Sequence, residues 1–353
     1  MRVAIVGLPY SGKTTLFTAL SGLTRDHLNA AEENLAAVKI PEPRLDWLEE
    51  LYKPKKRTEP TMDFVDLPGS AEGDTDSAGL TKHLPTLRQA DAMLICVRAF
   101  ESDAVPTPKG GVNPLRDLQN LRDEMLLADM MICDKRVETL EKAITKPTKD
   151  VDHQKRELAL LKRCREALES LKPLSGVVSP GEEEKLLRSF GFTTQKTVVV
   201  VINVGEADAA KPPAFEDEHA LATLSMCATL EADLIQLDPA DRKEMAAGYG
   251  LSEGARDRVI RACFNALGMH VFLTAGEEEV RSWPIPKGFT AVEAAGKIHS
   301  DLARGFIRAE TVAYEDLKAA GNMRDAKAQN KVRQEPKPYV VQDGDIMTIK
   351  FNV

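Results

Sequence analysis

The chain has 353 residues, with 43% hydrophobic residues, 29% charged residues and a formal net charge of −8. This length is about twice that of a typical domain, so we expect two domains, or one large domain with an insertion. The composition is that of a globular protein and excludes a mainly disordered chain. The acidic balance argues against bulk nucleic-acid binding, so we expect no DNA partner, although local basic patches stay open.

The cysteines and the apolar runs indicate a cellular compartment. The five cysteines lie far apart and form no CxxC pair, which is typical of reduced thiols and not of a disulfide frame or a zinc site. The apolar run at residues 1–7 is too short for a signal peptide, and the run Val198–Ile202 is far short of a bilayer span. We therefore expect a cytoplasmic protein without a membrane partner.

Short apolar runs typical of buried strands alternate with helical stretches. We expect strands at Val3–Val6, Ala37–Ile40, Met62–Asp66, Met93–Val97, Thr197–Ile202 and Thr223–Cys227. Helical stretches are expected at Leu16–Leu20 and Leu80–Gln89. This alternation predicts an α/β fold with a mainly parallel sheet.

The pattern changes between residues 115 and 171, where apolar residues recur at helical spacing and no strand-like run occurs. A polar, proline-containing break at residues 146–150 divides this stretch. We interpret it as an antiparallel helical hairpin inserted in the α/β domain. Periodicity leaves two roles open for the hairpin, a partner-binding arm or a pair of helices packed on the body with one solvated face.

The C-terminal part has a different charge balance. From Arg281 onward, 12 Lys and Arg stand against 9 Asp and Glu, a net +3 that leaves −11 for the preceding residues. We expect a helix at Ala291–Leu302, followed by strands at Phe306–Val312, Tyr339–Gln342 and Ile346–Phe351. These elements predict a small α+β module.

Residues 7–14, GLPYSGKT, fit the phosphate-binding pattern G-x-x-x-x-G-K-[ST] between a predicted strand and a helical stretch. Backbone N–H groups of such a loop surround phosphate oxygens, and the helix N-terminus adds positive charge. Lys13 is the candidate catalytic residue because it reaches the β- and γ-phosphates, and the Thr14 hydroxyl is a candidate Mg²⁺ ligand. The candidate nucleotide-binding residues of this segment are Pro9, Tyr10, Ser11, Gly12, Lys13, Thr14 and Thr15.

The segment Asp66-Leu67-Pro68-Gly69 ends the predicted strand Met62–Asp66. In P-loop NTPases an aspartate at a strand end binds Mg²⁺ directly or through water, so Asp66 is the second candidate metal ligand. The N–H of Gly69 is placed to contact the γ-phosphate. No residue stands out as a general base; His83 is either near the γ-phosphate or an ordinary histidine on a helix face.

A third motif, Asn203-Val204-Gly205-Glu206, stands where guanine-specific P-loop proteins carry N-K-x-D. Val204 replaces the lysine, and the Glu206 carboxylate is one methylene longer than that of aspartate. Both changes disturb a site built for the guanine edge and favour ATP over GTP. We expect Asn203, Val204 and Glu206 near the base, with Cys227 and Ala228 in the loop under it; a polar loop without a ligand is the alternative.

These motifs and their order resemble the Obg-like ATPase family, the YchF-type branch of the translation-factor-related P-loop NTPases. Further family-like stretches are IPEPRLD at 40–46, KPKK at 53–56, FLTAG at 272–276, AAGKIHSD at 294–301, RGFIRAE at 304–310 and YVVQDGD at 339–345. The resemblance implies a nucleotide-dependent switch that hydrolyses ATP slowly with Mg²⁺, prefers ATP to GTP and associates with the ribosome or rRNA. We expect a monomer.

The resemblance also implies the domain layout. A P-loop G domain is expected over 1–114 and 176–278, the helical hairpin over 115–175 and a C-terminal β-grasp (TGS) domain over 279–353. The basic run Lys53–Arg57 is a candidate contact for rRNA phosphates, with a solvated loop as the alternative.

Several positions depart from the family pattern. Tyr10 and Ser11 replace Asn and Val, and Tyr10 lacks the amide oxygen that helps to hold potassium in related enzymes, which argues against potassium stimulation. Ala30 and Ser70 stand where the family carries a threonine and an apolar residue. These departures favour low turnover without a partner and keep two alternatives open, a GTPase of the same superfamily and a non-hydrolysing, nucleotide-gated ribosome- or RNA-binding protein.

Overall fold

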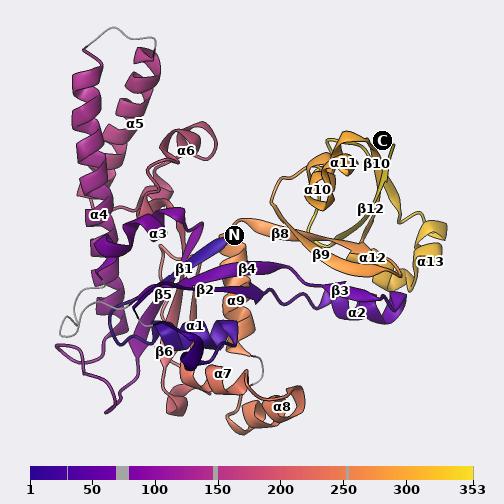
Figure 1. Cartoon of the computed structure of the whole chain (residues 1–353), viewed down its shortest axis with the longest axis horizontal. Helices are drawn as coiled ribbons and strands as arrows, with labels where there is room; N and C mark the ends of the chain where they lie inside the picture. The colour runs from indigo at the N-terminus through magenta and orange to yellow at the C-terminus, as the bar shows by residue number, and fades with distance from the viewer. Residues whose placement is uncertain (30, 69–78, 146–149, 252–253, 353) are drawn as a thin grey trace. The chain divides into compact units, whose positions relative to one another are not determined.

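The computed structural model describes residues 1–29, 31–68, 79–145, 150–251 and 254–352 (Figure 1). The chain forms two compact units. The first comprises Met1–Val38 and Asp63–Cys263, and the second comprises Lys39–Met62 and Phe264–Val353. Within the described ranges, no helix is both long and apolar enough to span a membrane.

The first unit is built on a six-stranded sheet with the order β2-β4-β1-β5-β6-β7. Its strands are β1 (Arg2–Val6), β2 (Asn34–Lys39), β4 (Thr61–Asp66), β5 (Ala92–Ala99), β6 (Thr197–Val204) and β7 (Ala222–Met226). Strand β1 pairs in parallel with β4 and β5, and β6 pairs in parallel with β5 and β7. The predicted α/β class with a mainly parallel sheet is confirmed, and each predicted run overlaps a strand of this sheet, with ends that differ by at most three residues.

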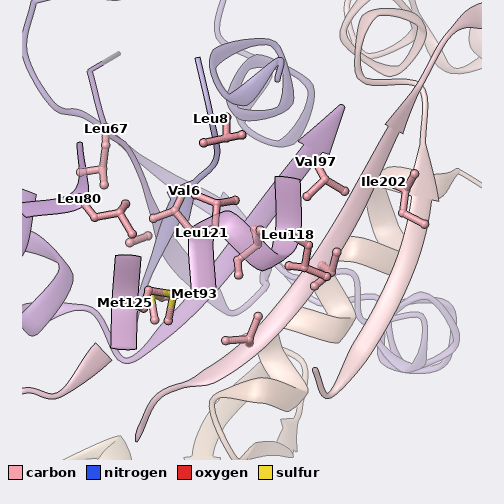
Figure 2. Close-up of a cluster of buried hydrophobic side chains, with 14 of the residues drawn as sticks. Val6, Leu8, Leu67, Leu80, Met93, Val97, Leu118, Leu121, Met125 and Ile202 are labelled. Carbon is pink, nitrogen blue, oxygen red and sulfur yellow. The ribbon is translucent and has the colours of Figure 1, made fainter. Parts of the chain in front are cut away.

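Helices cover this sheet because its central strands are apolar on both faces. They are α1 (Lys13–Ser21), α3 (Leu84–Gln89), α7 (Ala228–Leu234), α8 (Pro239–Gly248) and α9 (Ala255–Ala266). Figure 2 shows one buried cluster, in which strand residues meet a long helix and the loops that follow β1 and β4. Leu8, Leu67 and Leu80 belong to this cluster, so the core holds the loops that the sequence marks as functional.

The insert forms two antiparallel helices, α4 (Pro114–Ala143) and α5 (Val151–Glu169), drawn together in Figure 1. Helix α4 starts at Pro114 because the Asn113 side chain caps it by accepting the N–H of Arg116. Arg136 of α4 binds Glu157 of α5, with 2.7 Å between Nε and Oε1. The hairpin has a buried core of its own, to which α6 (Glu182–Leu187) contributes Leu187.

The second unit holds another six-stranded sheet, with the order β11-β10-β12-β8-β9-β3. Its strands are β3 (Lys56–Thr58), β8 (Met269–Ala275), β9 (Glu279–Pro286), β10 (Phe306–Ala313), β11 (Arg333–Glu335) and β12 (Asp345–Phe351). Its helices are α2 (Arg44–Tyr52), α10 (Ala291–Ile298), α11 (Ser300–Arg304), α12 (Tyr314–Ala320) and α13 (Met323–Ala328). The small residues of α10 let it pack closely against Phe272, Phe306 and Met347.

Some boundaries differ from the sequence-based expectations. Residues 39–62, which we assigned to the nucleotide-binding domain, fold with the C-terminal unit because β3 pairs in parallel with β9. The helix expected at Ala291–Leu302 is divided at His299, whose extended backbone and capping side chain begin α11. The strand expected at Tyr339–Gln342 is reduced to a single bridge between Val340 and Thr290.

Candidate nucleotide-binding site

The loop between β1 and α1 has a tight backbone conformation that requires glycine at positions 7 and 12. Gly12 has φ 93° and precedes the first turn of α1. A Cβ atom on Gly7 would lie 2.5 Å from the carbonyl oxygen of Cys96, so no larger residue fits there. Tyr10 adopts φ 60°, which is uncommon for a residue with a side chain, and the residue is 37% exposed. The loop is thus held tightly, with Tyr10 at its surface.

Lys13 lies against the inner side of this loop. Its Nζ donates hydrogen bonds to the carbonyl oxygens of Gly7, at 2.9 Å, and Leu8, at 3.1 Å. Burial lowers the pKa of Lys13, while the Cys96 thiol and Asp66 act in the opposite direction. A cation held by carbonyls at a helix N-terminus is ready to exchange them for phosphate oxygens.

Thr14 and Asp66 form the candidate metal site. The Thr14 hydroxyl donates to Oδ2 of Asp66 at 2.9 Å, which joins the first turn of α1 to the end of β4. The other carboxylate oxygen of Asp66 is buried and has no hydrogen-bond partner among the described residues. Burial raises the pKa of Asp66, while Thr14 and Lys13 lower it. A hydroxyl beside a carboxylate with a free oxygen fits a hard cation such as Mg²⁺.

Asn203 connects three loops at the carboxyl ends of the strands. Its side-chain amide donates to the carbonyl oxygen of Ser11 at 2.9 Å, and its Oδ1 accepts the N–H of Ala228 at 3.1 Å. The side chain is only 4% exposed. The structure therefore brings Asn203, the phosphate-binding loop and the Cys227–Ala228 segment together, as the sequence predicts.

The remaining residues predicted near the base have different surroundings. Val204 is 2% exposed and packs in the hydrophobic core, so it offers the site only its backbone. Glu206 is exposed at the start of the 3-10 turn Glu206–Asp208. Cys227 is buried just before α7, and burial raises the pKa of its thiol. Gly69, Ser70 and Ala30 lie outside the described residues.

Phe100 is a site residue that the sequence analysis missed. Its ring lies 4.0 Å from the Cβ position of Gly12, and its Cβ lies 3.6 Å from that of Gly205. Arg98, which is 1% exposed, supports it: the guanidinium carbon stands 4.7 Å from the ring centroid, and Nε donates to the carbonyl oxygen of Phe100 at 3.0 Å. An aromatic residue directly after a parallel strand is the signal that points to this position.

Two other basic features have defined partners. Arg25 donates from Nη2 to the hydroxyl of Thr15 at 2.7 Å, a contact without a sequence signal. In the second unit, Lys55 binds Glu278 at 2.6 Å and Arg57 binds Asp46 at 2.7 Å. The basic run 53–57 is therefore largely compensated by carboxylates, which favours its interpretation as a solvated loop.

The parallel sheet and the loop around Lys13 define a P-loop nucleotide-binding protein with a G-domain fold. A family model described as "50S ribosome-binding GTPase" matches residues 2–135. Another, YchF-GTPase_C, described as "Protein of unknown function (DUF933)", matches residues 269–352.

The chain belongs to the family of YchF and the Obg-like ATPases. It is 38% identical to "Ribosome-binding ATPase YchF" of Bacillus subtilis, and the alignment covers 100% of both chains. It is 33% identical to "Obg-like ATPase 1" of Oryza sativa subsp. japonica, covering 100% of this chain and 92% of that one. The solved structure of the Schizosaccharomyces pombe YchF GTPase is similar, with a TM-score of 0.83 and 28% identity over 99% of this chain and 97% of that chain.

Proposed function

We propose that this chain is a ribosome-associated ATPase that binds ATP with Mg²⁺ at the loop formed by residues 7–14. The observation that carries the proposal is the arrangement of Lys13, Thr14 and Asp66 at one end of the parallel sheet. Each side chain is oriented for a different part of a nucleoside triphosphate. Lys13 reaches the β- and γ-phosphates, and the oxygens of Thr14 and Asp66 hold the cation.

Hydrolysis relies on positioning and charge neutralisation by these groups. When bound, Mg²⁺ neutralises charge on the β- and γ-phosphates and supports the departure of the diphosphate. Lys13 gives up its hydrogen bonds to the carbonyl oxygens of Gly7 and Leu8. Its ammonium group then stabilises the negative charge that develops on the bridging oxygen. The backbone N–H groups of the loop hold the phosphates in line. We expect turnover to be low without a partner.

Adenine preference follows from the residues near the base. Phe100 offers a ring face to a base between Gly12 and Gly205, and stacking does not select one purine over the other. Selection falls to the segment 203–206, where Glu206 replaces the aspartate that reads guanine in related proteins. The exposed position of Glu206 leaves it free to approach the amino group of adenine, a hydrogen-bond donor.

Calorimetric titration of the full chain with ATP and GTP, each with and without Mg²⁺, tests this proposal. We expect ATP to bind at least about tenfold more tightly than GTP, a difference of about 1.4 kcal/mol. Phosphate release should exceed that of Lys13→Ala, a variant that removes the phosphate-binding cation. Tighter binding of GTP would overturn the adenine assignment and support the GTPase alternative. Binding without turnover above the Lys13→Ala rate would support a non-hydrolysing switch.

The ribosome association is supported by the relatives, several of which are named ribosome-binding ATPases. Co-sedimentation with purified bacterial ribosomes, with ADP or a non-hydrolysable ATP analogue present, tests it. We expect a nucleotide-dependent bound fraction that decreases with rising salt, because contacts to rRNA phosphates release counterions. An unchanged pellet with and without ribosomes would contradict the association.

A further inference from the structure

Arg25 is an exposed arginine that contacts the first turn of α1. It begins the 3-10 helix η1 (Arg25–His27), which follows shortly after α1 ends. Its Nη2 donates a hydrogen bond to the hydroxyl of Thr15 at 2.7 Å. Thr15 comes directly after Lys13 and Thr14 in α1. The guanidinium group therefore lies at the helix N-terminus that carries the phosphate-binding loop.

The segment after α1 turns back along the helix, and several bonds fix this turn. Gly22 ends α1 with φ 76°, a conformation that a side chain disfavours. The side chain of Gln236, which follows α7, donates to the carbonyl oxygen of Gly22 at 3.1 Å. The N–H of Leu28 donates to the carbonyl oxygen of Arg25 at 3.0 Å and closes η1. These contacts explain how Arg25 comes to lie beside Thr15.

The hydrogen bond to Thr15 uses only part of the donor capacity of Arg25. An arginine has five N–H donors in a planar group whose shape matches phosphate oxygens. Within the described ranges, Arg25 forms no ion pair with a carboxylate. Arg136 of α4, by contrast, is paired with Glu157. Arg25 thus presents a positive charge without a counter-ion beside the candidate nucleotide site, where an anionic ligand can supply one.

The order of the residues in the loop indicates which phosphate Arg25 meets. Lys13 reaches the β- and γ-phosphates, and Thr14 and Asp66 hold the cation that bridges them. The backbone N–H groups of such a loop surround the α- and β-phosphates. Thr15 lies one residue further into α1 than the metal ligand. A group bonded to its hydroxyl is therefore placed on the side of the α-phosphate.

We propose that Arg25 binds the α-phosphate of the bound nucleotide through its positive charge and its remaining N–H groups. ATP and ADP share this phosphate, so Arg25 increases the affinity for both nucleotides and does not select the triphosphate. It is a binding residue outside the loop motif and does not act on the γ-phosphate. This role rests on the nucleotide binding proposed above.

The test measures the Kd of ADP and of a non-hydrolysable ATP analogue, each with Mg²⁺, for the full chain and three variants. Arg25→Ala removes the charge and the donors and should weaken both ligands by about tenfold, because charge-assisted hydrogen bonds to phosphate are strong. Arg25→Gln keeps a donor for Thr15 without the charge and should lose as much. Arg25→Lys keeps the charge and should recover part of the affinity. Parent-like binding by Arg25→Gln would show that only the bond to Thr15 matters and would overturn the proposal.

Arg188→Ala is the matched control, because Arg188 is an exposed arginine at the end of α6. Its Kd values should equal those of the parent chain. Arg25→Ala and Arg188→Ala should both keep the parent's Tm, which separates loss of a ligand contact from loss of folding. The difference in Kd between the parent chain and Arg25→Ala should shrink as the salt concentration rises, because the contact is electrostatic and exposed. A difference that is independent of salt would contradict a contact between charges.

The same titrations separate this role from the proposed function. A parent chain that binds neither ligand would overturn the nucleotide-binding proposal and the role of Arg25 with it. A parent chain that binds both ligands, with no change in Arg25→Ala, would overturn the role of Arg25 alone. A loss confined to the ATP analogue would place Arg25 at the γ-phosphate, as would slower single-turnover hydrolysis at an unchanged Kd. Either result would contradict the assignment to the α-phosphate.

Discussion

Asn203→Ala is the substitution that tests the architecture of the site most directly. The variant deletes the donor to Ser11 and the acceptor of the Ala228 N–H. The Ser11 carbonyl retains a partner, because the Cys96 thiol donates to it at 3.3 Å. The Ala228 N–H is left buried without an acceptor. Loss of the first bond costs about 1 kcal/mol and the stranded N–H about 1–3 kcal/mol, so we expect the first unit to lose about 3 kcal/mol of unfolding free energy.

The assay has to follow the first unit by itself. Both tryptophans, Trp47 and Trp283, lie in the second unit, so their fluorescence reports on that unit. Urea-dependent hydrogen exchange of peptides from β5 and β6 follows the first unit, and a peptide that contains Ala228 reports the broken bond. We expect earlier exchange of all three peptides in Asn203→Ala, together with at least tenfold weaker ATP binding, about 1.4 kcal/mol.

Asn265→Ala provides the control: Asn265 is exposed on α9 and belongs to the second unit, so the same substitution there should leave hydrogen exchange in the first unit unchanged. Its effect should stay within about 0.5 kcal/mol. A loss below about 1 kcal/mol in Asn203→Ala, or unchanged exchange at Ala228, would refute the reasoning that one buried amide joins the two loops.

Three further changes have expected outcomes. Phe100→Ala removes the ring beside Gly12 and should weaken binding of ATP and GTP alike by about 1–3 kcal/mol in calorimetry; a loss for one nucleotide only would contradict stacking. Gly12→Ala places a Cβ 2.2 Å from the Asn203 amide at φ +93°, so thermal unfolding should show a loss of about 2 kcal/mol or more. Burial raises the pKa of Asp343, but hydrogen bonds from Arg44 and the backbone outweigh it and hold the pKa below 3.8. This stabilisation is present above that value and disappears as the pH falls through the folded pKa, so the tryptophan-monitored stability of Asp343→Asn should decline less than that of the parent chain on acidification.

The centre of the parallel sheet was predictable because strands β1, β5 and β6 are buried on both faces and therefore appear as continuous apolar runs. The short strand β3 has no such signal, since its residues Lys56–Thr58 are polar and its place depends on pairing with β9. Strand β9 contains Pro284 and Pro286, which argue against a strand in sequence. Both lie beyond the residues that β3 contacts, so no N–H is needed from them on that side.

The candidate site also contains residues that the sequence predicts and residues that it does not. The phosphate loop could be predicted because its glycines and Lys13 occupy positions that the backbone and the phosphates both require. Asn203 was predictable from its place at a strand end. The contributions of Phe100 and of its supporting residue Arg98 were not, because a buried arginine under an aromatic ring depends on how the loop after β5 folds back.

Helix α4 is long enough for a small tilt near the nucleotide loops to produce a large displacement at its far end. Its 30 residues extend without a break over about 45 Å. The end near Leu121 belongs to the core beneath the nucleotide loops, whereas Val137 and Leu140 belong to the separate core of the hairpin. A tilt of about 10° at Leu121 would carry the far end of the helix, about 33 Å away, through about 6 Å. A shift of less than a side chain's width beside the phosphates would therefore displace the far end of α4 by enough to change its contacts with a large partner.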